Sequence, residues 1–144
     1  EAPEKAMVYA IDVDGQSYDI AAVSMGNPHA VLNVDNVENA PVAELGAKIE
    51  AHSRFPNRVN VGFMQIVSRN EIKLRVFERG VGETEACGSG ACAAAVAALQ
   101  QGLVDSPVTM QLTRGSLKID WQGEGQELIM TGPTATVFHG RIRI

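Results

Sequence analysis

Alternation of apolar and polar side chains runs through most of the chain and predicts a sheet of short strands. In MVYAIDV (7–13) an apolar side chain falls on every second residue, and Asp14-Gly15 then provides the turn signal of a hairpin. Similar short β-type runs, separated by turn residues, mark the other segments that we expect to be strands: 17–23, 30–34, 59–68, 72–77, 108–113, 116–122, 127–132 and 134–144. The sequence therefore predicts roughly seven to nine short strands.

Two segments have a helical pattern instead. After Pro41, which suits the first turn of a helix, apolar residues recur at helical spacing over 42–49. From 90 to 101 almost every residue is small or apolar, and no polar residue occurs before Gln100. A helix that is apolar all round is buried all round, and small side chains allow close approach. We therefore expect one α/β (α+β) domain, residues 1–144, with a curved, mostly antiparallel sheet wrapped around a central Ala-rich helix.

Composition and charge narrow the possible function without naming it. The 144 residues are 45% hydrophobic and 20% charged, which is ordinary for one soluble globular domain. The formal net charge of −5 argues against nucleic acid as a partner, because such partners require a basic surface. No segment approaches the ~20 apolar residues of a membrane span, and the first ten residues do not have the pattern of a signal peptide. Two cysteines are too few for a disulfide scaffold, so we expect reduced thiols and a cytoplasmic location.

The segment ETEACGSGACAAA (83–95) places a cysteine in a turn of small residues directly ahead of the predicted helix. The unpaired N–H groups at a helix N-terminus carry partial positive charge, so we expect Cys87 to be accessible and its pKa to be lowered. Gly88 and Gly90 leave their amide groups open to an approaching ligand, and Ser89 adds a hydroxyl. An inert buried cysteine in a glycine turn is the competing interpretation, and the sequence supports both about equally.

Other polar residues have an ordinary interpretation beside a functional one. Glu78 and Arg79 follow a predicted strand and together suit a zwitterionic substrate, although a solvated ion pair is the commoner arrangement. Asn27 and His29 lie in GNPH, where a simple chain reversal is the ordinary explanation. Asn60 is out of phase with its apolar neighbours, and such a residue usually faces solvent.

These segments carry a resemblance. GNPH, RVNVGF and ERGVGETEACGSGACAAA, in this order and at this spacing, resemble the C-terminal half of the diaminopimelate epimerase family over essentially the whole chain. Related proline racemases have a cysteine setting closer to SPCGTG, and the phenazine-biosynthesis relatives lack the cysteine. The resemblance implies one of two similar lobes, each a curved sheet around a central helix, with the active site in the cleft between them. It also implies interconversion of L,L- and meso-diaminopimelate, for lysine and cell-wall precursor synthesis, without pyridoxal phosphate, another cofactor or a metal.

The resemblance further implies a role for each matching residue. In the family one thiolate removes the α-proton and a second thiol returns a proton on the opposite face, and Cys87 matches the cysteine of this lobe. The other matches are Gly88 and Ser89 for the α-carboxylate, Glu78 and Arg79 for the substrate's amino and carboxylate groups, Asn27 and Asn60 for its distal end, and His29 for tuning the thiols. Cys92 lies on another side of the predicted helix, so we expect it to be core rather than the second thiol or a metal ligand.

The first lobe, with its own cysteine, has no counterpart in this sequence, and three hypotheses stay open. The chain is the C-terminal lobe of a diaminopimelate epimerase, a lobe of a related amino-acid racemase, or a fragment that only binds or assembles. The sequence does not begin with methionine, so we expect an excised or processed piece. Because it offers only one of the two thiols, we expect it to be inactive alone. The expected partners are diaminopimelate, the missing N-terminal lobe, to which residues 133–144 would return, and a second copy in a homodimer. No cofactor, metal, nucleic acid or membrane is expected.

Overall fold

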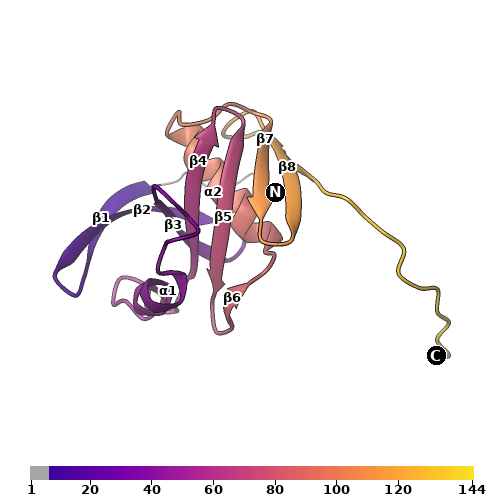
Figure 1. The fold of residues 1–144 in the computed structure, drawn as a ribbon, viewed down its shortest axis with the longest axis horizontal. Coiled ribbons are helices and arrows are strands. Elements are labelled where there is room, and N and C mark those ends of the chain that lie inside the picture. Colours follow the sequence, from indigo (N-terminus) through magenta and orange to yellow (C-terminus); the bar gives the residue numbers. More distant parts are fainter. Residues whose placement is uncertain (1–6) are drawn as a thin grey trace.

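Nine strands and two helices follow one another along residues 7–144, the part of the chain that the computed structural model describes (Figure 1). In chain order they are β1 (Met7–Val13), β2 (Gln16–Ser24), β3 (Pro28–Asn33), α1 (Val42–Glu50), β4 (Asn60–Ser68), β5 (Glu71–Glu78), β6 (Gly82–Thr84), α2 (Gly88–Gln100), β7 (Val108–Leu112), β8 (Gly115–Trp121) and β9 (Leu128–Thr131). The expected helices are both present, and α2 begins two residues before the predicted start.

The strands form one sheet in the order β1-β2-β3-β4-β5-β7-β8-β9, with β6 paired to β5. Neighbouring strands are antiparallel except for the pairs β3/β4 and β5/β7. Parallel neighbours need a crossover connection, and in this sheet each crossover contains a helix, α1 for the first pair and α2 for the second. The expected α+β architecture with a mostly antiparallel sheet is therefore confirmed.

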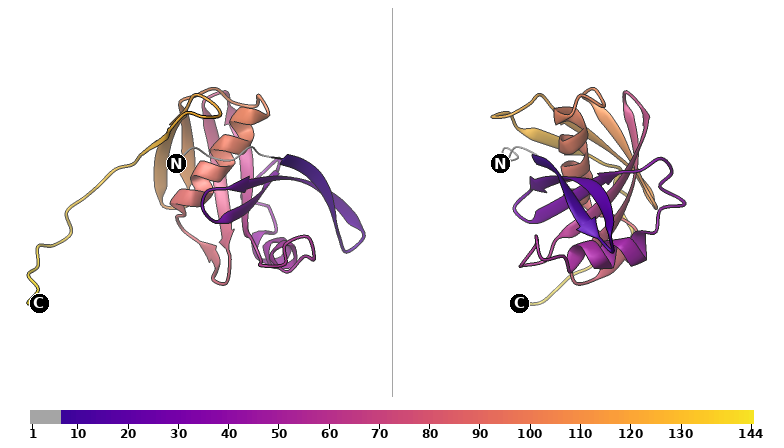
Figure 2. Two further views of the ribbon diagram at one scale, coloured as in Figure 1. Left: turned by 180° about the vertical axis from the view of Figure 1, so that it is seen from behind. Right: turned by 90° about the vertical axis from the view of Figure 1, so that its left-hand side faces the viewer.

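Helix α2 lies in the hollow of the curved sheet (Figure 2). Its residues from Ala93 to Ala98 are all 0% exposed, as the pattern without a polar stripe predicted. Strand residues from both halves of the sheet pack around it, among them Val23 of β2, Leu74 of β5 and Ile119 of β8. Small side chains on α2 let the strands come close on several sides at once, which explains the alanine run.

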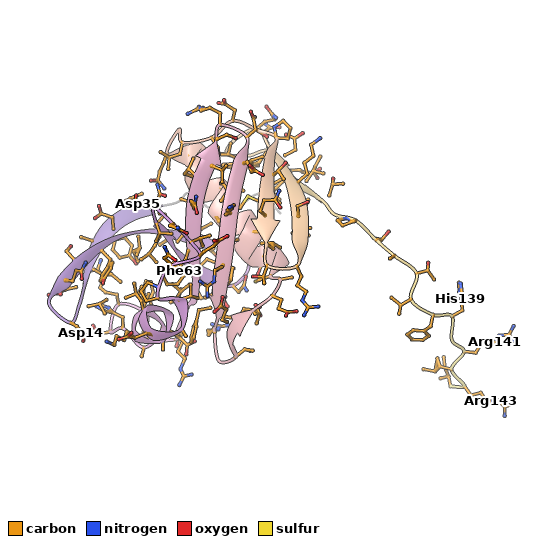
Figure 3. The ribbon with its side chains drawn as sticks, in the orientation of Figure 1. Asp14, Asp35, Phe63, His139, Arg141 and Arg143 are labelled. Carbon is orange, nitrogen blue, oxygen red and sulfur yellow. The ribbon has the colours of Figure 1, made fainter. Side chains whose placement is uncertain are left out.

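Helix α1 packs on the opposite face of the sheet, where a second cluster forms around Phe63 of β4 (Figure 3). The helical repeat predicted from the sequence supplies its buried hydrophobic side chains, Val42, Leu45 and Ile49. Strand β4 serves both clusters, because Phe63 belongs to this one and its neighbour Met64 to the cluster around α2. The sheet is thus covered by one helix on each face, and α2 is the more deeply enclosed.

Two parts of the strand prediction differ from the structure. Strand β6 was missed because three residues are too short for alternation to be recognised. The strand expected at 134–144 is wrong: residues 132–144 have no regular structure and extend away from the sheet (Figure 1). Alternation makes a strand only where another strand offers hydrogen bonds, and within residues 7–144 no strand pairs with this segment.

Candidate active site at the start of helix α2

Cys87 is the N-cap residue of α2 and has an extended backbone conformation, with φ −141° and ψ 104°. Its Sγ accepts a hydrogen bond from the backbone N–H of Gly90 at 3.3 Å, so the sulfur caps the helix as an oxygen of serine or aspartate would. A Cβ on Gly90 would lie 3.1 Å from that Sγ and 3.0 Å from Cγ2 of Val76. The third position after the cysteine therefore needs glycine, because the sulfur and β5 fill the space.

The expectation that Cys87 is accessible and acidic is wrong for this structure. The residue is 7% exposed, and its burial raises the pKa of the thiol above the ordinary value. The hydrogen bond with Ser89, whose Oγ lies 3.6 Å from the sulfur, and the one donated by Gly90 act in the opposite direction. The neighbouring Glu78 carboxyl group raises the pKa further. Loss of hydration therefore outweighs the favourable helix N-terminus, and the sulfur is held as a neutral thiol at neutral pH.

Cys92 has the structural role that the sequence predicted. It is buried one and a half turns into α2, and its Sγ contacts Sδ of Met130 at 3.8 Å. Burial raises the pKa of this thiol to about 11, and the neighbouring Cys87 adds to the effect. A thiol with this environment is a poor nucleophile and a poor base at neutral pH.

The GNPH segment, residues 26–29, is connected directly to the start of α2. Asn27 donates from Nδ2 to Oγ of Ser89 at 3.3 Å, and its Oδ1 lies 3.1 Å from Nε2 of His29. His29 is 2% exposed, and burial lowers its pKa from 6.5 to about 4, an effect opposed by Glu78 and increased by Arg79. His29 is therefore neutral at neutral pH. GNPH is more than a chain reversal, because two of its side chains extend the polar contacts of the thiol.

Asn60 does not face solvent, contrary to the ordinary interpretation of its position. It is 5% exposed at the start of β4, where Nδ2 donates to the carbonyl oxygen of Pro28 at 3.0 Å. Its Oδ1 accepts from the backbone N–H of Arg79 at 2.9 Å. One amide group thus joins the turn that carries Asn27 and His29 to the end of β5.

Glu78 is the last residue of β5 and Arg79 follows it, and their side chains lie in different environments. Glu78 is half-buried, and its carboxyl group is near enough to both Cys87 and His29 to raise the pKa of each. The exposed Arg79 guanidinium donates to the carbonyl oxygen of Asn57 at 3.4 Å rather than to Glu78. The two groups expected to bind a zwitterion therefore do not pair with each other here, and each could contact a different group of a ligand.

Sequence reasoning missed two residues that shape this site. Glu50, the last residue of α1, accepts from the backbone N–H of Gly80 at 3.2 Å and so fixes the turn after Arg79. Met130 of β9 lies over the helix start, where a Cβ on Gly88 would be 3.5 Å from its Cε. Neither carries a sequence signal, because each reaches the site from an element that is remote along the chain.

The assembled site offers one buried thiol, a carboxyl group, a neutral histidine, two carboxamides and the free amide groups of a helix start. Such a set can hold an anionic group and exchange one proton. Within residues 7–144 no group of three or more His, Cys, Asp or Glu residues gathers as metal ligands. Neither helix in this part of the chain is long and apolar enough to cross a membrane.

Comparison with known proteins decides the family. The family model described as diaminopimelate epimerase matches residues 21–137. The chain belongs to the diaminopimelate epimerase family. Over all 144 residues it is 60% identical to the diaminopimelate epimerases of Ectopseudomonas mendocina (strain ymp) and Stutzerimonas stutzeri (strain A1501). It covers 52% of each relative, so it spans about half the length of the curated epimerases that it matches.

Solved structures support the fold of this diaminopimelate epimerase family member. A probable proline racemase from Agrobacterium radiobacter K84 matches 89% of the chain with a TM-score of 0.63 and 16% identity, over 46% of its own length. A Bacillus anthracis phenazine biosynthesis protein of the PhzF family matches 90% of the chain with a TM-score of 0.56 and 19% identity, over 40% of its own length. At these identities the likeness concerns the fold alone.

Proposed function

We propose that the chain is the C-terminal lobe of a diaminopimelate epimerase and that Cys87 is one of two acid/base thiols that invert the α-carbon. The observation that carries this proposal is the position of Cys87, a buried N-cap thiol in contact with Ser89 and close to Glu78. Inversion needs a proton donor on one face of the carbon and an acceptor on the other. This lobe supplies one of these groups.

The raised pKa of Cys87 suits the donor half of that cycle. Held as a neutral thiol, Cys87 would protonate the carbanion on its own face, and the resulting thiolate would remove a proton in the reverse direction. The α-carboxylate of diaminopimelate would bind at the amides of Gly88 and Ser89, where the helix start stabilises the charge that develops during deprotonation. The substrate ammonium near Glu78 would lower the pKa of the thiol on binding.

The remaining groups would hold the rest of the substrate. Arg79 offers an exposed guanidinium that can turn from the carbonyl of Asn57 to a substrate carboxylate. Asn27 and Asn60 would contact the distal end, and each Nδ2 has one hydrogen beyond the bond it already donates. His29, kept neutral by its burial, would tune the thiols without adding charge to the cleft.

The other wall of the cleft would come from an N-terminal lobe that carries the second cysteine. Residues 133–144 would return to that lobe, and their exposed side chains of Val137, Phe138, Ile142 and Ile144 support a role in contact with another surface. A homodimer of the complete protein would be a further assembly. Lysine and cell-wall precursor synthesis in the cytoplasm, without a cofactor, would be the setting of the reaction.

The deciding experiment follows conversion of L,L- to meso-diaminopimelate in D₂O, together with exchange of the α-proton. The chain alone should be inactive, because general acid–base groups contribute about 10²–10⁴-fold each and half of the cleft is absent. Mixing it with a separately produced N-terminal lobe should restore exchange. In that mixture Cys87→Ala should abolish activity and Cys92→Ala, the matched control, should retain it. Equal loss in both variants would contradict the assignment of Cys87.

A further inference from the structure

A continuous hydrogen-bond path leads from the buried His29 to the thiol of Cys87. Nε2 of His29 lies 3.1 Å from Oδ1 of Asn27, Nδ2 of Asn27 lies 3.3 Å from Oγ of Ser89, and that Oγ lies 3.6 Å from Sγ of Cys87. The path joins the start of β3 and the residue before it to the start of α2. Two of the steps join residues two positions apart, and the step from Asn27 to Ser89 joins residues that are remote in sequence.

The chemistry of the groups gives this path a direction. Oδ1 of Asn27 can only accept, so the single ring proton of the neutral His29 must lie on Nε2. Nδ2 of Asn27 can only donate, so Oγ of Ser89 accepts there and keeps its own hydrogen for the sulfur of Cys87. The backbone N–H of Gly90 also donates to this sulfur. Ser89 and Gly90 are then both donors to Sγ, which stabilises a thiolate and opposes the effect of the neighbouring Glu78 carboxyl group.

The opposite direction would favour the thiol. If the amide of Asn27 were turned over, Ser89 would donate to Oδ1, and Cys87 would have to donate its own hydrogen to Ser89. His29 would then accept at Nε2 and carry its proton on Nδ1. The orientation of one carboxamide therefore decides whether Ser89 is a donor or an acceptor toward the sulfur.

We propose that Asn27 is a positioning residue that, held by His29, orients Ser89 as a hydrogen-bond donor to the thiolate of Cys87. This role rests on the proposed function, in which Cys87 must become a thiolate during each cycle. It differs from the distal-ligand role, since Asn27 acts here on the acid/base group and not on the substrate. Substitutions at Asn27 should accordingly change the protonation of Cys87 when no substrate is present.

Other groups also influence the same thiol and have to stay constant in a test. Glu78 on β5 raises the pKa of Cys87, and Cys92 lies further along α2, where it interacts with Cys87. His29 is neutral, and Arg79 lies next to Glu78 on the exposed side. A Cys92→Ala background leaves one thiol to titrate and keeps Glu78, His29 and Arg79 in place.

The experiment titrates Cys87 in that background by the ¹³Cβ chemical shift of labelled cysteine. Ser89→Ala removes the donor and should raise the pKa of Cys87 by about one unit, a tenfold decrease in thiolate at a fixed pH below the pKa. Ser89→Thr keeps the hydroxyl and should leave the pKa nearly unchanged. Asn27→Asp turns both side-chain atoms into acceptors, so Ser89 must donate to it and the pKa of Cys87 should also rise.

The double variant separates positioning from charge. In a Ser89→Ala background Asn27→Asp can act only through its negative charge, so its effect on the pKa should be clearly smaller than in the presence of Ser89. Equal shifts in the two backgrounds would overturn the proposal, because Asn27 would then not act through Ser89. These titrations need neither substrate nor the second lobe, so their result is separate from the epimerisation assay.

A second measurement needs no substitution along the path. Nitrogen chemical shifts of labelled His29 should report the Nε2–H tautomer at a pH where Cys87 is a thiolate. The Nδ1–H tautomer under that condition would overturn the proposal, even if the Asn27→Asp variant failed to fold. Far-UV circular dichroism of every variant identifies such a failure before titration.

Discussion

At the scale of single residues, burial shifts the pKa values of two ionisable groups at the candidate site, His29 and Cys87. His29 has an unfolded-state pKa of about 6.5 and a folded-state pKa of about 4, so the unfolded chain binds the proton more readily in between. Stability must therefore rise with pH across that window and fall as pH decreases. Burial also raises the pKa of Cys87, so this thiol titrates above neutral pH, whereas His29 titrates below it.

The His29 shift gives a pH-dependent stability that can be measured. Between pH 7 and pH 5 its contribution should decrease by about 2 kcal/mol, because protonation is then favoured only in the unfolded chain. Urea unfolding at the two pH values should show this decrease, and His29→Gln should remove it while other acidic effects remain. An unchanged difference between the two pH values in the variant would mean that His29 is not the responsible group.

The two glycines beside Cys87 form a matched pair for a second test. Gly90→Ala should destabilise the chain by about 1–2 kcal/mol and alter the alkylation rate of Cys87, since the added Cβ meets the sulfur at 3.1 Å. Gly88→Ala is the control, because its Cβ meets only Met130, at 3.5 Å, an ordinary contact. Thermal unfolding and alkylation followed by mass spectrometry measure both. Equal effects from the two substitutions would contradict the crowding described at Gly90.

The residues of the candidate site could be predicted from the sequence, but their burial and their hydrogen-bond partners could not. Cys87 stands out in the sequence because glycines and a serine surround it at a helix start. Its burial depends on remote strand residues such as Val76 of β5, which the local pattern does not include. The same holds for Asn60, whose place in the alternation suggests solvent and whose actual partners, Pro28 and Arg79, lie at the start of β3 and just after β5.

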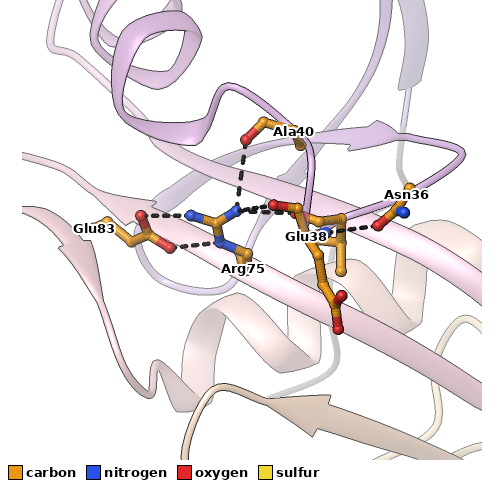
Figure 4. A network of polar contacts seen from close by, with 6 residues as sticks. Asn36, Glu38, Ala40, Arg75 and Glu83 are labelled. Atoms are coloured by element: carbon orange, nitrogen blue, oxygen red, sulfur yellow. Dashed lines mark hydrogen bonds and ion pairs between the residues drawn. The ribbon is translucent and has the colours of Figure 1, made fainter.

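At the scale of elements, contacts between secondary structures depend on a few specific side chains. Arg75 of β5 is the clearest example (Figure 4). Its guanidinium pairs with the carboxylate of Glu83 in β6 at 2.6 and 2.9 Å. The same group donates to the carbonyl oxygens of Val37, Glu38 and Ala40, at 3.0, 3.3 and 3.5 Å. One side chain thus fixes a loop and a three-residue strand to the sheet.

Replacing Arg75 should therefore loosen two segments together. We expect Arg75→Met to destabilise the chain by about 1–2 kcal/mol and to accelerate amide exchange in residues 36–40 and in β6. Lys73→Met on the same strand is the control, since its 4.0 Å pair with Glu38 is exposed and should contribute little. Hydrogen exchange followed by mass spectrometry locates the change. Faster exchange confined to one of the two segments would contradict the shared role of Arg75.

The packing of α1 gives a second prediction at this scale. A Cβ at Gly46 would lie 2.7 Å from both Cβ and Cγ of Phe77, so Gly46→Ala must push the helix away from β5. We expect a net loss of about 1–3 kcal/mol, although alanine favours a helix by about 1 kcal/mol over glycine. Ala47→Gly at the exposed neighbouring position measures that propensity alone. Chemical unfolding of both variants tests this, and a Gly46→Ala variant more stable than the original chain would contradict the close contact.

Most elements were predictable because their pattern reflects burial of one or both faces. The alternation in β5 and the helical repeat in α1 indicate which side of each element packs on the core. The alanines of α2 indicate a helix that is buried on all sides. The pairing order and the two parallel pairs were not predictable, since side-chain patterns do not say which strand lies beside which. Residues 134–144 show the same limit, because they alternate like a strand without a partner strand in the described part of this chain.

At the scale of the whole molecule, residues 133–144 are separate from the body that carries the site. Figure 3 shows His139, Arg141 and Arg143 on this extension, away from the sheet. A chain ending at Gly132 should therefore keep its melting temperature within about 1–2 °C, because the removed residues bury nothing in it. The same deletion should prevent activation by the N-terminal lobe in the mixing assay. A clear fall in melting temperature would show that the extension packs on this lobe.

The enclosure of α2 has a consequence for how the chain folds. Alanine has the highest intrinsic helix propensity, so this 13-residue segment should populate helical turns early, yet at such a length a helix is only marginally stable in water. Its methyl groups gain little from contact with any one strand, and the strands that enclose it come from positions as distant as β2 and β8. We therefore expect a rate-limiting step in which widely separated strands close around a transient helix. Contacts between such distant segments make folding slow for the chain's length.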